Sequence, residues 1–185
     1  MSFKAAFIDR DGVINEDYGY VYSWENFRFK KNLKKGLLIL QNLGYKLIII
    51  TNQSGIGRGY YSDSDYKKLT IRYLSELRKC KITIDAVYHC PHDPTKFDKH
   101  TFCNCRKPNP GLIIEAIRSF NIDPKKSIII GDKISDIQAG VRGGIQQRYL
   151  INKSHKPDDL ISHTFKSLFD CAQYISNIEK EMILL

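Results

Sequence analysis

Two aspartates two residues apart, Asp9 and Asp11, are the first residues whose types and spacing could do chemistry. They follow a strand-like apolar segment, and alternate side chains at a strand end can face one cavity. Such a pair can bind a divalent cation, or one carboxylate can act as a nucleophile while the other transfers a proton. Because Asp-x-Asp is also common in solvated turns, the pair alone does not assign a function.

A second polar segment, residues 51–59, combines hydroxyl and amide side chains with three glycines. Backbone N–H groups of a glycine-rich loop can approach an oxyanion closely, although a flexible turn would explain the same residues. The cations Arg106 and Lys107 follow later, and Asp132 and Asp136 come after another strand-like run. An acidic residue at such a position can also be a simple helix cap.

Cysteine placement predicts a second kind of site. Cys90, His92, Cys103 and Cys105 lie within the segment 90–105, and three thiolates plus one imidazole form a tetrahedral zinc set. With no open coordination position the zinc would be structural, fixing the loop that presents Arg106 and Lys107. Buried free thiols are the alternative. His89 and His100 are competing ligands, ranked lower because the paired spacing omits them.

The elements that must position these residues alternate along the chain. Apolar runs and helical periodicity predict strands over 3–9, 46–51, 86–89, 127–131 and 147–151, with helices over 32–43, 63–79, 110–120, 136–142 and around 165–175. This alternation predicts an α/β fold, a doubly wound parallel sheet with helices on both faces. We expect one domain over residues 1–185. Ligands bind such sheets at the carboxyl ends of the strands, at a topological switch point.

The composition limits the kinds of partner that the protein can be expected to bind. The chain has 185 residues and a formal net charge of +9. That charge suits either nucleic acid or small anions, but the basic residues are dispersed, so we expect no nucleic-acid partner. The apolar runs are too short to span a membrane, and the N-terminus lacks a signal-peptide layout. We therefore expect a cytoplasmic protein, and a monomer because no coiled coil or extra apolar helix is evident.

The order of the motifs is more specific than any one of them. Asp-x-Asp, Thr-Asn, Lys and Gly-Asp-x-x-x-Asp, over roughly residues 3–150, resemble the motif set of the haloacid dehalogenase (HAD) superfamily of phosphohydrolases. The resemblance implies that Asp9 is a nucleophile forming an aspartyl-phosphate and that Asp11 is the general acid and base. It implies that Thr51 holds the transferring phosphoryl group and that Lys107 neutralises it.

The same resemblance implies a catalytic Mg²⁺. Its ligands would be Asp9, the backbone carbonyl of Asp11, and Asp132, with Asp136 in support. The physical reason is that a carboxylate nucleophile must approach a phosphate that is also negatively charged, which requires a cation between them.

The predicted zinc-binding segment, residues 90–105, narrows the resemblance to one branch of this superfamily. Its members lack a cap domain and include heptose-bisphosphate and histidinol-phosphate phosphatases. Segments 9–15, 17–21, 51–59 and 105–108 look most like the heptose enzymes, although Val13 stands where threonine is common. The implied substrate is a small phosphorylated sugar, heptose 1,7-bisphosphate, losing its 7-phosphate in nucleotide-activated heptose synthesis for surface polysaccharide. The implied substrate contacts are Asp17, Tyr18, Gly19, Tyr20, Asn52, Gln53, Ser54, Arg106 and Lys133. The alternatives are a histidinol-phosphate phosphatase and a nucleic-acid 3′-phosphatase.

Overall fold

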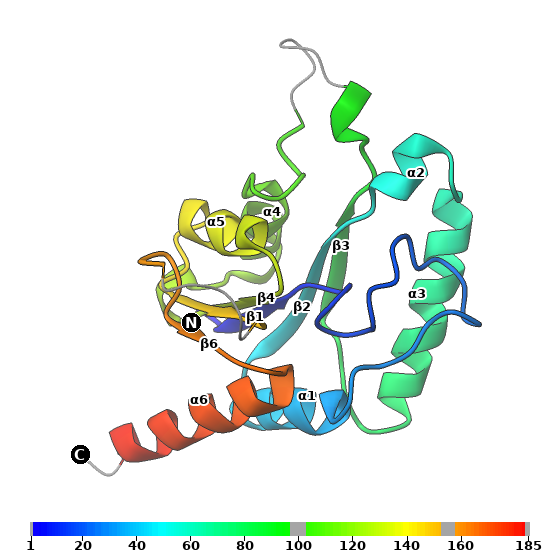
Figure 1. Ribbon diagram of the computed structural model, residues 1–185. Coiled ribbons are helices and arrows are strands. Elements are labelled where there is room, and N and C mark those ends of the chain that lie inside the picture. The colour runs from blue at the N-terminus through cyan, green and yellow to red at the C-terminus, as the bar shows by residue number, and fades with distance from the viewer. Residues whose placement is uncertain (1, 97–102, 153–157, 184–185) are drawn as a thin grey trace.

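The computed structural model describes residues 2–96, 103–152 and 158–183. Within these ranges the chain forms one sheet of six parallel strands in the order β3-β2-β1-β4-β5-β6 (Figure 1). The strands are β1 (Ala5–Ile8), β2 (Lys46–Asn52), β3 (Ala86–Cys90), β4 (Ile128–Gly131), β5 (Gln147–Leu150) and β6 (His163–Thr164). The predicted parallel α/β fold is confirmed.

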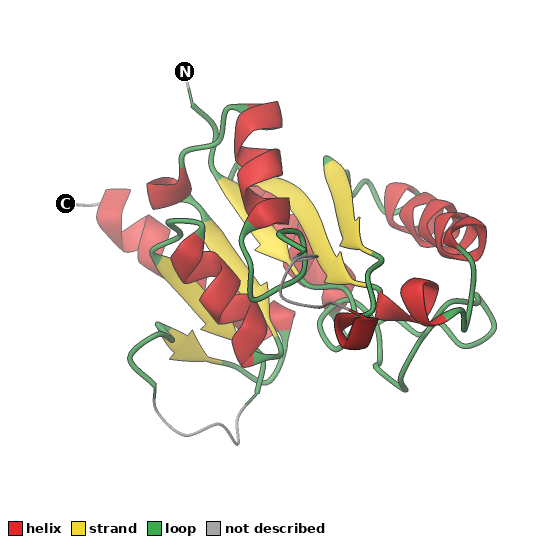
Figure 2. Ribbon diagram, turned by 90° about the horizontal axis from the view of Figure 1, so that it is seen from above, coloured by secondary structure: helices red, strands yellow, loops and turns green. Residues whose placement is uncertain are grey.

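Helices cover both faces of the sheet (Figure 2). They are α1 (Leu33–Asn42), α2 (Ser54–Arg58), α3 (Asp63–Arg78), α4 (Gly111–Phe120), α5 (Ile134–Arg142) and α6 (Leu168–Ile183), with single 3₁₀ turns at Pro94–Lys96 and Pro124–Lys126. Apolar residues of α1, α3 and α6 share one core cluster, whereas those of α4 and α5 belong to the other. None of the described helices is long and apolar enough to cross a bilayer.

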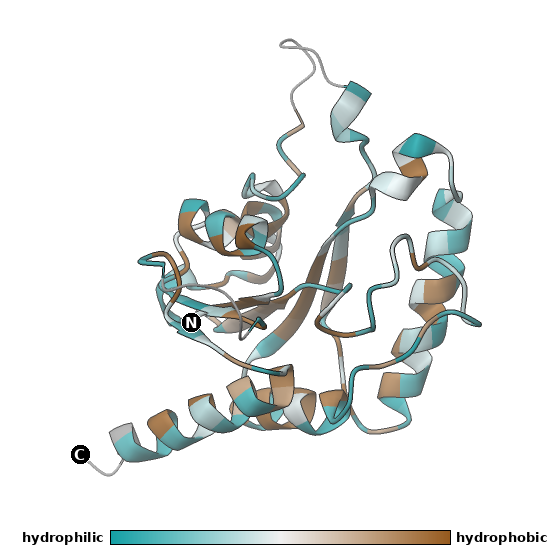
Figure 3. Ribbon diagram, viewed as in Figure 1, coloured by the Kyte–Doolittle hydropathy of each residue, from teal (hydrophilic) through white to brown (hydrophobic). Residues whose placement is uncertain are grey.

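The strands form because their apolar side chains alternate between these two cores. In β1, Ala6 and Ile8 enter the first cluster, while Ala5 and Phe7 enter the second. All four are fully buried. The strands at the centre of the sheet are accordingly coloured mainly as hydrophobic (Figure 3). A strand buried on both faces reads as a continuous apolar run, and that is why the sequence predicts it well.

Strand order places the switch point beside β1. The chain leaves β1 toward β2 and β3, then returns to place β4 on the opposite side of β1. The carboxyl ends of β1 and β4 are therefore adjacent where the winding direction reverses, the usual ligand-binding position in this architecture. In its described part, the segment between β3 and α4 is a loop with one 3₁₀ turn rather than a cap domain.

Two elements differ from the sequence prediction. Residues 54–58, expected as a glycine loop, form helix α2, and the two-residue strand β6 was not predicted. A Cβ at Gly57 would lie 2.6 Å from the backbone nitrogen of Asp93, so this glycine serves close packing rather than a flexible turn. Strand β6 carries only exposed residues, His163 and Thr164, so no apolar pattern marks it.

Candidate active site

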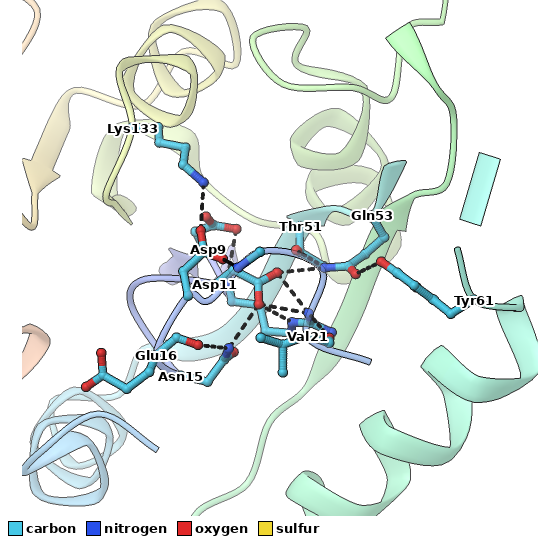
Figure 4. A network of polar contacts seen from close by, with 12 residues as sticks. Asp9, Asp11, Asn15, Glu16, Val21, Thr51, Gln53, Tyr61 and Lys133 are labelled. Carbon is cyan, nitrogen blue, oxygen red and sulfur yellow. Dashed lines mark hydrogen bonds and ion pairs between the residues drawn. The ribbon is translucent and has the colours of Figure 1, made fainter. Parts of the chain in front are cut away.

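A cavity of about 470 Å³ opens at the carboxyl ends of the strands. Its wall is formed by residues that follow β1 and end or follow β2, by the segments before α3 and α4, and by residues at the start of α5. They are Asp9, Asp11, Asp17, Gly19, Tyr20, Thr51, Asn52, Gln53, Ser54, Tyr61, Arg106, Lys107, Pro108, Lys133, Ser135 and Asp136. Figure 4 shows part of this polar network.

Asp9 directly follows β1 and is only 6% exposed. Its backbone N–H donates to the carbonyl of Ile130 (3.0 Å), which continues the pairing of β1 with β4 past the strand end. Its carboxylate Oδ1 accepts from the backbone N–H of Arg10 (2.8 Å) and from Lys107 Nζ (2.8 Å). These contacts fix the carboxylate at the floor of the cavity.

Lys107 reaches this floor from the segment that precedes α4. Its Nζ contacts Asp9 Oδ1, Asp136 Oδ1 (2.6 Å) and the carbonyl of Ile50 (2.9 Å). Its backbone is held by Asn52, since the Lys107 N–H donates to Asn52 Oδ1 and Asn52 Nδ2 donates to the Lys107 carbonyl, both at 3.1 Å. The end of β2 thus positions the lysine through a reciprocal pair of hydrogen bonds.

Three carboxylates converge around this lysine. Oxygen atoms of Asp9, Asp132 and Asp136 all lie within 4.8 Å of one another. The missing side chain of Gly12 makes this approach sterically allowed, because a Cβ there would lie 2.2 Å from Asp132 Oδ2. Gly131 likewise leaves room for Asp136, because a Cβ added at Gly131 would lie 2.2 Å from the Cβ of Asp136.

The electrostatics of the cluster favour a further cation. Burial raises the pKa of Asp9 to about 8, against the opposing effect of Lys107 and with help from the Asp136 and Asp132 charges. Burial also raises the pKa of Asp132 above its ordinary range. Burial alone would lower the pKa of Lys107, but Asp136 and Asp9 raise it, so this amine stays protonated. One ammonium therefore does not neutralise three clustered carboxylates, two of them buried.

These residues fit a hard divalent cation. Asp132 Oδ1 is buried and has no hydrogen-bond partner among the described residues. Mg²⁺ takes oxygen ligands, prefers carboxylates and keeps several waters, which matches an oxygen-only cluster beside an open cavity. Asp9 and Asp132 are the carboxylates that would hold it. Both oxygens of Asp136 are already engaged, Oδ1 by Lys107 Nζ and Oδ2 by the Lys133 backbone N–H.

Asp11 is held by donors from three side chains. Arg10 binds it through Nε (3.2 Å to Oδ1) and through Nη2 (2.8 and 2.9 Å to the two oxygens). Asn15 Nδ2 donates to Oδ1 and Gln53 Nε2 donates to Oδ2, each at 2.9 Å. The fully buried Arg10 side chain also donates to the carbonyl of Val21 (2.7 Å).

Sequence reasoning missed Arg10, Asn15 and Tyr61. A signal was present for Arg10, because an arginine within a strand-end motif must be paired once buried. Asn15 ends the segment 9–15 that carries the resemblance, but nothing in that segment assigned its side chain a role. Tyr61 follows the glycine segment and reaches the site through its hydrogen bond to Gln53.

Most of the remaining residues that the sequence predicted for the site line the cavity, and one lies on the surface. Asp17, Gly19, Tyr20, Thr51, Asn52, Gln53, Ser54, Arg106 and Lys133 lie on the cavity wall. Tyr18 is 69% exposed and is not among the lining residues. Arg106 Nη1 is buried without a hydrogen-bond partner in the described part of the chain. Lys133 Nζ lies 3.2 Å from Asp17 Oδ2 at the cavity mouth.

The four soft ligands also come together. The closest contacts are 2.8 Å between the sulfurs of Cys103 and Cys105, and 3.0 Å between His92 Nδ1 and Cys103 Sγ. Cys90 Sγ lies 3.5 Å from both His92 Nδ1 and Cys103 Sγ. Zn–S and Zn–N distances of about 2.0–2.3 Å place tetrahedral ligands at comparable separations, so the donor set fits zinc.

The competing histidines are not part of this cluster as described. His89 Nε2 lies 3.0 Å from Asp63 Oδ1, and its ring packs 4.3 Å from that of Tyr66. His89 is half-buried. His100 lies outside the described residues.

The loop that carries the four cysteine and histidine ligands, here called the cysteine–histidine loop, contacts the active site at both of its ends. It leads into Lys107 at one end, and Cys90 lies at the end of β3 at the other. The backbone N–H of Gln53 donates to the Cys90 carbonyl (2.7 Å), and the Gly57 N–H donates to the Pro91 carbonyl (2.8 Å). An ion pair joins Arg58 to Asp93 at 3.2 Å.

Comparisons with known proteins identify the family. The HAD-hydrolase-like family model matches residues 104–170. The D-glycero-alpha-D-manno-heptose-1,7-bisphosphate 7-phosphatase of Photorhabdus laumondii is 45% identical over 154 residues, covering 82% of this chain and 84% of that protein. The corresponding beta-named enzyme of Haemophilus influenzae is 36% identical over 183 residues, covering 96% and 99%.

A solved structure supports the fold. The crystal structure of D,D-heptose 1,7-bisphosphate phosphatase from B. bronchiseptica, complexed with magnesium and phosphate, has a TM-score of 0.81. It is 24% identical and covers 93% of this chain and 97% of that one.

The fold and site together define a hydrolase of the HAD type. Its parallel sheet places a buried aspartate, two further carboxylates and a lysine at the switch point, in the motif order of that class. Within the class, the chain belongs to the D-glycero-D-manno-heptose-1,7-bisphosphate 7-phosphatase family of phosphatases. The family resemblance predicted from the motifs is confirmed.

Proposed function

We propose that this protein is a Mg²⁺-dependent phosphatase that removes the 7-phosphate of D-glycero-D-manno-heptose 1,7-bisphosphate. The observation that carries the proposal is the buried Asp9 carboxylate, fixed by Lys107 beside Asp132 at the floor of the cavity. The relatives named for this activity span most of the chain, which supports the choice of substrate.

In the first step, an oxygen of Asp9 attacks the phosphorus of the 7-phosphate. The bond between phosphorus and the C7 oxygen breaks, and Asp11 gives its proton to that oxygen, which leaves as the sugar hydroxyl. The product on the enzyme is an aspartyl-phosphate. Thr51 lies on the same wall and would hold the phosphoryl oxygens, while Lys107 contributes positive charge below them.

In the second step, Asp11 is ionised and takes a proton from water. The water oxygen bonds to phosphorus, the bond to Asp9 breaks, and free phosphate leaves. When bound, Mg²⁺ would supply charge neutralisation between the carboxylates and the phosphate oxygens. Asp9, Asp132 and the Asp11 backbone carbonyl would hold it, with Asp136 in support through Lys107.

The rest of the cavity would bind the sugar and the remote 1-phosphate. Arg106 offers a guanidinium with an unpaired nitrogen, and Lys133 offers a half-exposed ammonium at the mouth. Arginine can bind a phosphate in bidentate fashion, and binding energy from the remote phosphate can orient the reacting one. Asp17, Gly19, Tyr20, Asn52 and Ser54 would contact the sugar. Tyr18, exposed beside them, would reach the substrate only if its loop moves.

We further propose that the cysteine–histidine cluster holds a structural Zn²⁺. We infer that residues 1–185 act as one domain, because the described strands form a single sheet. From the sequence we further propose that the protein is a cytoplasmic monomer. The place of the reaction would be nucleotide-activated heptose synthesis for surface polysaccharide.

A phosphate-release panel tests the substrate assignment. Purified protein with Mg²⁺ is assayed with the α- and β-anomers of the heptose bisphosphate and with histidinol phosphate. We expect the heptose bisphosphates to give a kcat/KM at least about a hundredfold above that of histidinol phosphate. The reason is that Arg106 and Lys133 can bind a second phosphate, which histidinol phosphate lacks. Efficient hydrolysis of histidinol phosphate alone would reject the assignment.

A further inference from the structure

Gln53 lies on the cavity wall, yet its amide is fully used within the protein. Its Nε2 donates to Asp11 Oδ2 (2.9 Å) and to Thr51 Oγ1 (2.8 Å), and its Oε1 accepts from the Tyr61 hydroxyl (2.6 Å). The residue is 2% exposed. Figure 4 shows the amide between these three side chains. No amide hydrogen is left for a substrate.

The orientation of this amide is determined by charge. Rotating it by half a turn would put its carbonyl oxygen against the Asp11 carboxylate, where two acceptors would repel each other. Tyr61 reinforces the same orientation because it donates to Oε1. Burial raises the pKa of Tyr61 well above its ordinary value, although the Arg10 charge opposes this, so the hydroxyl keeps its proton.

Tyr61 is itself fixed by packing. Its ring stacks on Tyr22 with centroids 5.0 Å apart and an interplanar angle of 11°. A Cβ at Gly55 would lie 2.1 Å from its Cε1 atom, so only glycine at that position lets the ring reach Gln53. The Tyr61 side chain is 7% exposed and has little room to move.

We propose that Gln53 and Tyr61 form a positioning pair that sets the side-chain orientations of Asp11 and Thr51 together. Gln53 then serves the reaction through its neighbours rather than by contacting the sugar. The inference rests on the proposed phosphatase function and refines it, since Asp11 transfers protons and Thr51 holds the phosphoryl group. A misplaced proton donor or base lowers the rate of the chemical steps.

Pre-steady-state kinetics with p-nitrophenyl phosphate separate this role from substrate contact. This substrate has no sugar, and its leaving group departs without a proton, so nitrophenolate release reports phosphoryl transfer to Asp9. Steady-state turnover also requires Asp11 to activate water. We expect Tyr61→Phe and Gln53→Met to keep the amplitude of the fast phase at about one nitrophenolate per chain. The rate of that phase should fall because Thr51 is misplaced, and steady-state kcat should fall about tenfold because Asp11 is misplaced as well.

The matched control is Tyr22→Phe, which removes a hydroxyl from the ring stacked on Tyr61 and should leave both phases unchanged. If Gln53 contacts the sugar instead, neither phase changes in its variant with this substrate, and the inference is overturned. If the pair only supports folding, the fast-phase amplitude falls while the rate per active chain stays constant, which also overturns it. Absence of turnover by the wild-type protein with Mg²⁺ would instead reject the phosphatase assignment itself.

Discussion

At the scale of single residues, Asp9 has its reactivity set by burial and by Lys107. The side chain is nearly inaccessible, accepts two hydrogen bonds on one oxygen, and lies beside two further carboxylates. An amide of the same shape cannot form the acyl phosphate. We therefore expect Asp9→Asn to lower phosphate release by at least about a thousandfold.

Folding should survive this change, because it removes one charge from a crowded anionic cluster. Thermal unfolding of Asp9→Asn is the companion measurement, and its melting temperature should equal or exceed that of the metal-free wild type. Residual turnover near the wild-type level would show that another group is the nucleophile.

The raised pKa of Asp9 gives a pH dependence with a definite sign. The folded protein without metal binds the Asp9 proton more tightly than the unfolded chain, whose aspartate has its ordinary pKa of 3.8. Stability of the metal-free protein therefore falls as pH rises from the ordinary value through about 8. Mg²⁺ needs the ionised carboxylate and would offset this loss.

The rise in melting temperature caused by a fixed Mg²⁺ concentration should thus be larger at about pH 9 than at about pH 6. Scanning calorimetry of the same preparation at both pH values measures the difference. An equal or smaller rise at the higher pH would show that Asp9 is not a ligand.

Residue types and spacing predicted which side chains meet, but not how they are oriented. Asp9 and Asp132 could be placed because each follows a buried parallel strand, and the carboxyl ends of parallel strands share one edge. The amide of Gln53 could not be oriented, since that depends on Asp11, Thr51 and Tyr61 at the same time. For the same reason the sequence suggested a substrate contact where the structure shows internal hydrogen bonds.

At the scale of elements, the cysteine–histidine loop connects β3, α2 and the segment that carries Lys107. Gln53 donates its backbone N–H to Cys90, and the Arg58–Asp93 ion pair fastens α2 to the same loop. Loss of the proposed zinc would therefore loosen both the lysine segment and the residue that positions Asp11. The spacing of the cysteines predicted that these side chains meet, but only the packing shows which elements the cluster connects.

Cys103→Ser tests the cluster. We expect zinc to fall from about one ion per chain to near zero, with a lower melting temperature and faster proteolysis within 90–107. Metal analysis and a thermal melt on one sample give both values.

The matched control is Cys80→Ser, a half-buried cysteine outside the cluster, which should keep its zinc. Unchanged zinc content in Cys103→Ser would mean that Cys103 is not a ligand.

Elements with strong apolar patterns were predicted closely, and short polar ones were not. The strands β2 and β4 match because each is buried on both faces by two separate cores. Helix α2 was missed because glycines at 55 and 57 disfavour a helix locally, and only contacts with Tyr61 and the loop after β3 compensate. Strand β6 is two exposed residues added to β5.

At the scale of the whole molecule, the net charge of +9 does not define a single binding face. Lys107 lies buried in the catalytic cluster, and Lys4, Lys30 and Lys46 pair with carboxylates elsewhere. We expect duplex DNA to bind no more tightly than the roughly 10⁻⁴–10⁻⁶ M of non-specific association at physiological salt. Fluorescence anisotropy against added salt measures this. Tight binding with a steep salt dependence would favour a nucleic-acid substrate.

The most direct test of the account follows the fate of each phosphate of the substrate. ³¹P NMR of heptose 1,7-bisphosphate incubated with the protein and Mg²⁺ resolves the C1 and C7 phosphates. We predict that the C7 signal is replaced by free phosphate while the anomeric C1 signal persists, and that Asp9→Asn leaves both signals unchanged. Loss of the C1 signal, or persistence of both signals with active wild-type protein, would contradict the proposed function.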